Sequence, residues 1–160
     1  MRVFKRCRKL GFHLVAHAGE EGPAGYVQAA LDLLKVERID HGVQCTEDTS
    51  LVSRLAREQI PLIVCPLSNV ILGIFKSLSE HNLKRLLEIG LMVTINSDDP
   101  AYFGGYLNQN WVETGCTLSL TCRKIYQIAR NGFKASFAES SARLRHMDQL
   151  DAYMEGSVLF

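Results

Sequence analysis

Hydrophobic and polar positions divide the chain into two kinds of segment. Short runs rich in apolar and β-branched residues predict strands, and longer stretches with apolar residues three or four positions apart predict helices. Strands are expected at residues 12–17, 37–42, 60–65 and 91–96. The third run is apolar almost throughout, which is typical of a strand that is buried on both faces of a parallel sheet.

Helices are predicted between these strands from their end signals. Pro23 suits the first turn of one helix, and Thr46 can cap a second. Ser77 and Glu80 have the spacing of a capping box, which predicts a third helix that stops at Gly90. The strands and helices therefore alternate along the chain.

A further helix is expected over residues 117–130, ending at Asn131-Gly132, with helix and tail beyond residue 133. Four strands that alternate with helices imply βαβ units, a parallel sheet and right-handed crossovers. Such units build either an open doubly wound sheet or part of a barrel. A complete (β/α)8 barrel takes about 250 residues, so four strands in 160 residues correspond to about half of one.

Composition narrows the functional classes. The net charge is +1, and 22% of the residues are charged, so bulk electrostatics favour neither a nucleic acid nor a membrane surface as a partner. No stretch approaches the ~20 consecutive apolar residues that span a bilayer. Five cysteines without a C-x-x-C pair argue against a disulfide framework and predict a reduced, cytoplasmic protein.

The N-terminus imitates a secretory signal, since five basic residues precede the apolar run "LGFHLVAHA". His13 and His17 interrupt that run, which is also short for the apolar part of a signal. We therefore expect an amphipathic helix that ends near Gly11 and is followed by a strand.

Polar side chains follow the end of each predicted strand. His17 closes the first strand and Glu20 follows it, His41 closes the second, Ser68 and Asn69 follow the third, and Asp98 and Asp99 close the fourth. The carboxyl ends of parallel strands share one edge of a sheet, where loops assemble active sites. Four strands that each deliver polar groups to this edge predict a functional site there.

Each of these residues, taken alone, also has a structural interpretation. A histidine at a strand end is more often a hydrogen-bonded part of the core than a metal ligand. Either aspartate could cap the next turn, Glu20 and Glu21 could be a solvated pair, and Ser68-Asn69 could bond to loop backbone. The remaining histidines, His13 in a strand and His81 and His146 in helical stretches, are expected to be structural.

The combination of residue types indicates metal chemistry. Histidine and carboxylate side chains without thiolates suggest a catalytic zinc or similar divalent ion with an open coordination position. A carboxylic acid opposite the ion could protonate a ring nitrogen of the substrate, while a second histidine steers the attacking water. One of the adjacent aspartates would meet the metal and the other the substrate.

Four motifs in a fixed order carry a resemblance to a known family. "HAGE", "IDHG", "CPLSN" and "NSDDP" resemble the adenosine/adenine deaminase family, which comprises zinc-dependent aminohydrolases on a (β/α)8 barrel. The loop "SDDPAYFGGYL" looks more like the adenine deaminase branch of bacteria and fungi. The resemblance implies that residues 1–160 are the C-terminal half of such a barrel. It also implies hydrolytic deamination of adenine to hypoxanthine, or of adenosine to inosine.

The resemblance carries over to five residues. It implies that His17 and Asp98 are zinc ligands, and that Glu20 protonates the purine ring at N1 during attack at C6. His41 would position the attacking hydroxide and act as a base, and Asp99 would hydrogen-bond the purine near N7. The expected cofactor is therefore Zn²⁺, and the expected partner is a small purine.

One family feature is missing from the sequence. Family members end their first strand in H-x-H, which supplies two further zinc ligands, and no H-x-H occurs in these 160 residues. We therefore expect weak zinc binding and little turnover from this chain alone. We also expect unpaired edges on the first and fourth strands and an open apolar sheet face, which would favour docking on the missing barrel half or self-association. The alternative is a non-catalytic remnant that acts as a binding or regulatory module.

Overall fold

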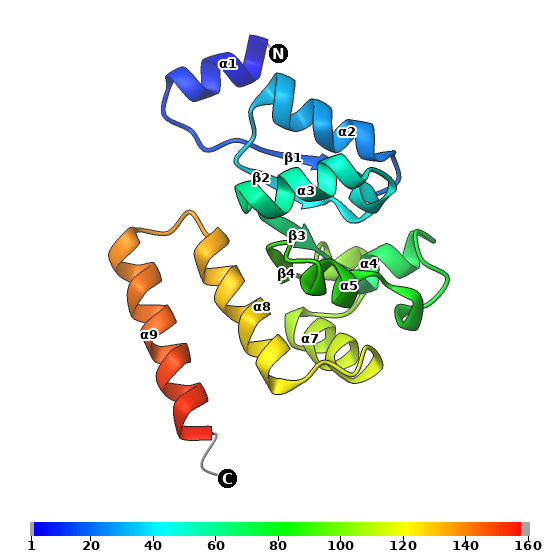
Figure 1. Ribbon diagram of the computed structural model, residues 1–160, viewed down its shortest axis with the longest axis vertical. Helices are drawn as coiled ribbons and strands as arrows, with labels where there is room; N and C mark the ends of the chain where they lie inside the picture. The colour runs from blue at the N-terminus through cyan, green and yellow to red at the C-terminus, as the bar shows by residue number, and fades with distance from the viewer. Residues whose placement is uncertain (1, 158–160) are drawn as a thin grey trace.

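The computed structural model describes residues 2–157 (Figure 1). Its four strands form one parallel sheet in chain order: β1 (Val15–Ala18), β2 (Arg38–His41), β3 (Leu62–Val64) and β4 (Val93–Ile95). All four predicted strands are present and parallel. Each one is shorter than predicted, because the ladder extends only over residues that pair with a neighbouring strand.

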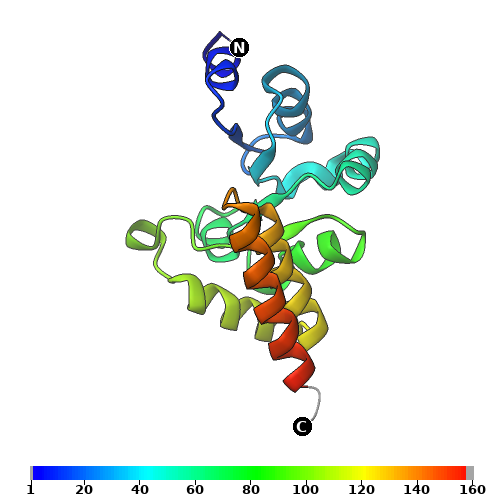
Figure 2. The ribbon, with the colours of Figure 1, turned by 90° about the vertical axis from the view of Figure 1, so that its left-hand side faces the viewer.

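Helices precede, separate and follow the strands. Before β3 the chain forms α1 (Arg2–Lys9), α2 (Ala24–Ala29), the π-helical η1 (Ala30–Leu34), the 3-10 helix η2 (Val43–Glu47) and α3 (Thr49–Glu58). Between β3 and β4 it forms α4 (Pro66–Ile71), the 3-10 helix η3 (Leu78–Glu80) and α5 (Leu83–Glu88). After β4 come α6 (Pro100–Phe103), α7 (Leu107–Thr117), α8 (Cys122–Ala135) and α9 (Ser140–Ser157). The last two helices pack side by side (Figures 1 and 2).

The first-turn contacts of two helices differ from the sequence prediction. Asp48, and not Thr46, caps α3, because its Oδ1 accepts hydrogen bonds from the backbone N–H groups of Ser50 and Leu51. The expected capping box at Ser77 and Glu80 is also absent from the described residues. Ser77 precedes the 3-10 helix η3 and Glu80 is its last residue, and the α-helix that follows starts three residues after Glu80.

The predicted helix over residues 117–130 is divided differently. Helix α7, which the sequence analysis missed, ends at Thr117. The chain then turns at Ser119, which has a left-handed φ of 49°. Thr121 caps α8 by accepting a hydrogen bond from the Lys124 N–H, and α8 continues through Asn131-Gly132 to Ala135. The glycine did not end the helix there, because Asn131 is buried against the sheet. The predicted C-terminal helix is present as α9.

The two faces of the sheet differ in composition. Ile39, Leu62 and Val93 are in register and fully buried on one face. The other face carries the registered row His17, Asp40, Ile63 and Thr94. None of the exposed large hydrophobic side chains among residues 2–157 belongs to a strand. The expectation of an open apolar face was therefore wrong, since that face is largely polar.

Helix α8 covers the edge of the sheet beside β4. The Asn131 Nδ2 group donates a hydrogen bond of 3.0 Å to the Val93 carbonyl oxygen, which does not face β3. The expected unpaired edge at β4 is therefore partly satisfied by a side chain. At the other end of the sheet, β1 pairs with β2 alone within the described part of the chain.

His13 lies before β1 and not inside a strand as predicted. Its ring stacks on Phe137 at a centroid distance of 4.0 Å, and its Nδ1 lies 2.8 Å from a Glu37 carboxylate oxygen. These contacts fit the structural role expected for this histidine. They also place it at the amino end of the sheet, away from the strand ends that carry the site.

The N-terminal segment forms the predicted helix, α1, which ends close to Gly11. All five cysteines are free thiols. Within residues 2–157, no helix combines the length and the apolar character that crossing a membrane requires.

Candidate active site

Polar residues from the ends of all four strands, though not all of those predicted, line one pocket at the carboxyl end of the sheet. The pocket has a volume of about 320 Å³, and its lining includes His17, Asp40, His41, Cys65 and Asp98. Each of the four strands delivers at least one of these side chains from its end or from the residues after it. The predicted convergence at one edge of the sheet is confirmed.

His41 reaches this pocket through an unusual backbone conformation. Strand alternation would place its side chain on the face opposite Asp40. Its φ of 65° is left-handed, as is that of the following Gly42, and its ring instead lies 5.1 Å from the ring of His17. The His41 side chain is only 2% exposed, and this burial lowers its pKa. A non-glycine residue in this conformation is strained, and such strain is concentrated at functional sites.

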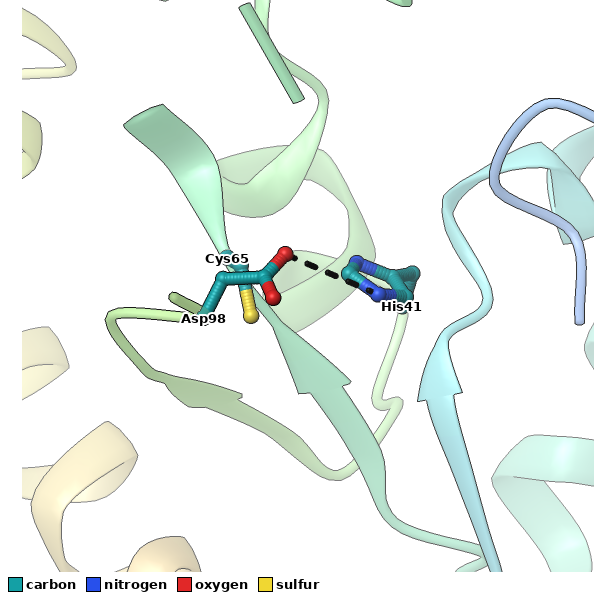
Figure 3. Close-up of side chains that lie close together, drawn as sticks. All are labelled: His41, Cys65 and Asp98. Atoms are coloured by element: carbon teal, nitrogen blue, oxygen red, sulfur yellow. Dashed lines mark ion pairs between the residues drawn. The ribbon is translucent and has the colours of Figure 1, made fainter. Parts of the chain in front are cut away.

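Asp98 approaches His41 from the loop after β4. Its φ of 58° is also left-handed, and its Oδ2 lies 3.9 Å from the His41 Nε2 (Figure 3). Cys65 lies beside this pair, and one ligand atom from each of the three residues fits within a span of 4.8 Å (Figure 3). Burial and the Asp98 charge raise the pKa of the Cys65 thiol to about 12, so it is protonated near neutral pH and a poor ligand.

Glu20 lies on the other side of the His41 ring. Its Oε1 is 3.1 Å from the His41 Nδ1 and accepts a hydrogen bond of 2.7 Å from the Asn69 Nδ2. Burial is the main cause that raises the pKa of the Glu20 carboxyl, and the Asp98 charge adds to it. Glu20 is therefore not the solvated partner of Glu21, which is exposed.

His17 is paired with a carboxylate that the sequence analysis did not identify. Asp40 lies directly opposite His17 in the β1–β2 register, and its Oδ2 is 3.3 Å from the His17 Nδ1. This pairing leaves Nε2 of His17 facing away from the carboxylate, the arrangement commonly seen for metal-binding histidines. The motif "IDHG" contained the signal, because Asp40 precedes His41 on a strand next to His17.

Asp99 makes the contact that its structural interpretation predicted, whereas Asn69 does not. The Asp99 Oδ1 accepts hydrogen bonds from the N–H groups of Ala101 and Tyr102, so Asp99 caps helix α6. Ser68 does bond to the backbone, at the Cys65 carbonyl oxygen. Asn69, however, is fully buried and bonds to side chains of the site, which the sequence pattern did not indicate.

The donor atoms of the pocket fit a zinc ion in type. Imidazole nitrogen and carboxylate oxygen are common zinc ligands, and a catalytic site needs about three protein ligands. His17 has a ring nitrogen available, its side chain is 70% exposed, and the Asp98 carboxylate lies within the same pocket. The described residues thus offer two suitable donors, with His41 beside them.

Comparison with known families identifies the chain. The family model described as "Adenosine deaminase" matches residues 1–153. The chain belongs to this family.

Relatives of the chain carry a more specific name. It is 56% identical to the adenine deaminase of Albidiferax ferrireducens over 154 residues, and 57% identical to that of Trichlorobacter lovleyi over 155 residues. Each match covers 96% of this chain but only 45% and 44% of the relative. The chain therefore spans a little under half the length of these family members, and the predicted resemblance to the adenine deaminase branch is confirmed.

Solved structures of the family support the fold. The adenine deaminase of Arthrobacter aurescens superposes with a TM-score of 0.94 at 45% identity, over 96% of this chain and 47% of that one. A zinc-bound amidohydrolase from Burkholderia ambifaria, at 24% identity and a TM-score of 0.82, shows the same fold. The predicted fold class, the C-terminal half of a (β/α)8 barrel, is confirmed.

Proposed function

We propose that this site contributes to the hydrolytic deamination of a purine, with adenine as the first candidate substrate. The observation that carries the proposal is the convergence of His17, His41 and Asp98 on one pocket at the carboxyl end of the sheet, with Glu20 in contact with His41. The names of the relatives at 56% and 57% identity support adenine over adenosine. The chain spans under half the length of those relatives. The deaminase activity of a protein of their full length is therefore proposed together with the role of this site.

Glu20 is the proposed general acid. Deamination at C6 of the purine requires a proton on ring nitrogen N1 as the water oxygen bonds to C6. Burial and the nearby Asp98 raise the pKa of Glu20, so that it holds a proton closer to neutral pH than an exposed glutamate does. A carboxyl group of this kind is suited to proton donation.

His41 is the proposed base. Burial lowers its pKa, so the ring is neutral near pH 7 and can accept a proton from the attacking water. The proton then moves to the exocyclic amino group, which leaves C6 as ammonia, and the remaining hydroxyl proton passes to the Glu20 carboxylate as the carbonyl of the product forms. Asp98, 3.9 Å away, stabilises the protonated ring electrostatically.

His17 and Asp98 are the proposed zinc ligands. Zinc, when bound there, supplies the Lewis acidity that makes water nucleophilic near neutral pH. Asp40 orients the His17 ring through Nδ1 and so presents Nε2 as the donor. Asp99 is proposed to hydrogen-bond the purine near N7 through its Oδ2, because its Oδ1 caps α6.

A chimeric enzyme tests this function. We would replace the matching segment of the Trichlorobacter lovleyi adenine deaminase with this chain and measure ammonia release from adenine and from adenosine. The chimera should deaminate adenine, and Glu20→Gln should lower kcat by about 10²–10⁴-fold while zinc content is unchanged. Glu21→Gln is the matched control, because that neighbouring side chain is exposed, and it should keep the parent rate.

Two results would contradict the proposal. If Glu20→Gln lost its zinc, Glu20 would be a ligand and not the acid. If the chimera folded and held zinc but released no ammonia from either substrate, these residues would not form a competent deaminase site.

A further inference from the structure

A chain of hydrogen bonds leads into the site from a histidine that none of the proposed catalytic roles uses. His81 follows η3 and is 4% exposed, with its ring packed against Phe75 at a centroid distance of 4.3 Å. The backbone N–H of Leu83 donates a hydrogen bond of 3.0 Å to the His81 Nδ1. A ring nitrogen that accepts a hydrogen bond carries no proton, so in the neutral ring the proton is on Nε2.

This tautomer fixes the orientation of the next side chain. The His81 Nε2 lies 3.2 Å from the Asn69 Oδ1, so the ring donates and the amide oxygen accepts. Asn69 itself is 0% exposed and lies in α4, in the turn that begins at Pro66. A flipped Asn69 amide would bring its NH₂ group against the N–H of His81, and two donors would then face each other.

The oriented amide holds both proposed proton-transfer groups at once. The Asn69 Nδ2 lies 2.7 Å from the Glu20 Oε1 and 3.3 Å from the His41 Nδ1. The Glu20 Oε1 also lies 3.1 Å from the His41 Nδ1, so this oxygen accepts from both the Asn69 amide and the His41 Nδ1–H. His41 Nε2 is then unprotonated, as the base role requires. A flipped amide would instead place its oxygen against the Glu20 carboxylate, which is repulsive in a buried site.

We propose that His81 and Asn69 are positioning residues that hold Glu20 and His41 in one hydrogen-bonded arrangement for proton transfer. The tautomer of His81 sets the direction of the series: the Leu83 N–H donates to His81, His81 donates to Asn69, and Asn69 donates to the Glu20 Oε1, which also accepts from the His41 Nδ1–H. Because Oε1 of Glu20 accepts the Asn69 hydrogen bond, the proton that Glu20 delivers is on Oε2. The proposal rests on the proposed function for what Glu20 and His41 do, but the direction of the hydrogen bonds does not.

Nitrogen NMR of the 160-residue chain tests the direction directly. With ¹⁵N-labelled histidine, His81 should show an unprotonated Nδ1 and a protonated Nε2 at neutral pH, and His41 should show a protonated Nδ1 and an unprotonated Nε2. The side-chain N–H signals of Asn69 should be shifted from those of an exposed asparagine. A His81 that is protonated on Nδ1, or on both nitrogens at neutral pH, would overturn the proposal.

Variants at His81 separate positioning from simple packing. His81→Gln places an amide N–H near the position of Nε2, so the Asn69 side-chain N–H signals should keep the chemical shifts they have in the parent. His81→Leu fills the space without a donor, so these signals should move toward those of an exposed asparagine. If His81→Leu does not fold, the tautomer measurement on the unaltered chain still decides the direction. Unchanged Asn69 signals in folded His81→Leu would overturn the proposal.

Kinetics distinguish this inference from the proposed function. In the chimera described above, His81→Leu should lower kcat by about 10–100-fold with little change in KM, and His81→Gln should recover most of the loss. An unaltered kcat in His81→Leu would overturn the positioning role while the deaminase function stands. A folded but inactive parent chimera would overturn the function, while the NMR result on the direction of the hydrogen bonds would still hold.

Discussion

Burial of His81 links the stability of the molecule to pH. Burial lowers the pKa of His81 to about 4, whereas the unfolded side chain titrates near 6.5. Between these values the unfolded state binds more protons, so the free energy of unfolding falls as the pH is lowered from about 6.5 to about 4. The difference of roughly 2.5 pKa units corresponds to a loss on the order of 3 kcal/mol.

Urea denaturation at pH 7 and pH 5 measures this effect. His81→Gln should be less stable than the parent at pH 7 and should lose less stability on acidification. His41 has a lowered pKa and Glu20 a raised one, and both are retained in the variant, so the comparison isolates His81. Equal pH dependence in the two proteins would mean that His81 titrates like an exposed histidine.

At the residue scale, the sequence identified the side chains of the site better than their contacts. His17, His41 and Asp98 could be predicted because strand ends in a parallel sheet converge, whatever the details of the loops. The left-handed backbones of His41 and Asp98 could not, since a positive φ is uncommon even for histidine and aspartate, which adopt it more often than most residues. The contacts of Asn69, which the sequence placed at the site edge, and of His81, which it left as structural, were not predicted. Their partners are 49 and 12 residues away in the chain and meet only after folding.

At the scale of elements, the ends of α3 offer a direct comparison between sequence and structure. Asp48→Ala should lower the urea midpoint, because it removes the acceptor of the Ser50 and Leu51 N–H groups. Asp48→Asn keeps a side-chain oxygen as acceptor and should therefore stay close to the urea midpoint of the parent. Thr46→Ala is the matched control and should leave the midpoint unchanged. If Thr46→Ala lowered the urea midpoint more than Asp48→Ala, Thr46 would be the cap of α3, as the sequence suggested.

The Asp48 cap should also depend on pH. Its hydrogen bonds lower the pKa of this carboxylate, so the stabilisation is present above the unfolded pKa and is lost as the pH falls through the folded one. The difference in midpoint between the parent and Asp48→Ala should therefore shrink below about pH 4.

Elements with strong periodicity were predicted well, and elements defined by tertiary contacts were not. All four strands are present, since their apolar runs are buried by helices on one face. The stretch over residues 107–117 was missed because its apolar residues, such as Val112 and Leu107, are exposed and give no amphipathic pattern. The end of α8 was misplaced because packing of Asn131 on Val93 outweighs the local preference of Gly132 to end a helix.

At the scale of the whole molecule, the sheet has a covered face and a functional face. Helices bury the apolar face, and the polar row that includes His17 and Asp40 turns toward the pocket. That distribution is expected for half of a barrel whose interior carries a site, since barrel side chains alternate between the lumen and the helices. The assignment of residues 1–160 to one partial barrel domain stays a prediction.

Zinc binding by the 160-residue chain follows from the ligands that this half supplies. The proposed ligands, His17 and Asp98, are two donors, whereas a catalytic zinc site has about three from the protein. We expect weak binding, so that zinc is removed by dialysis and metal analysis finds well under one ion per chain. Stoichiometric zinc after dialysis would show that further side chains complete the site.

Cobalt substitution identifies which side chains those would be. The cluster of His41, Cys65 and Asp98 is the competing ligand set, since its donor atoms lie within 4.8 Å of one another. Coordination by Cys65 would produce a thiolate-to-cobalt absorption band that Cys65→Ala abolishes. We expect no such band, because burial holds the Cys65 thiol protonated, and we expect His17→Ala to weaken cobalt binding instead. A thiolate band together with unchanged binding in His17→Ala would move the metal from the end of β1 to the space between β2 and β4.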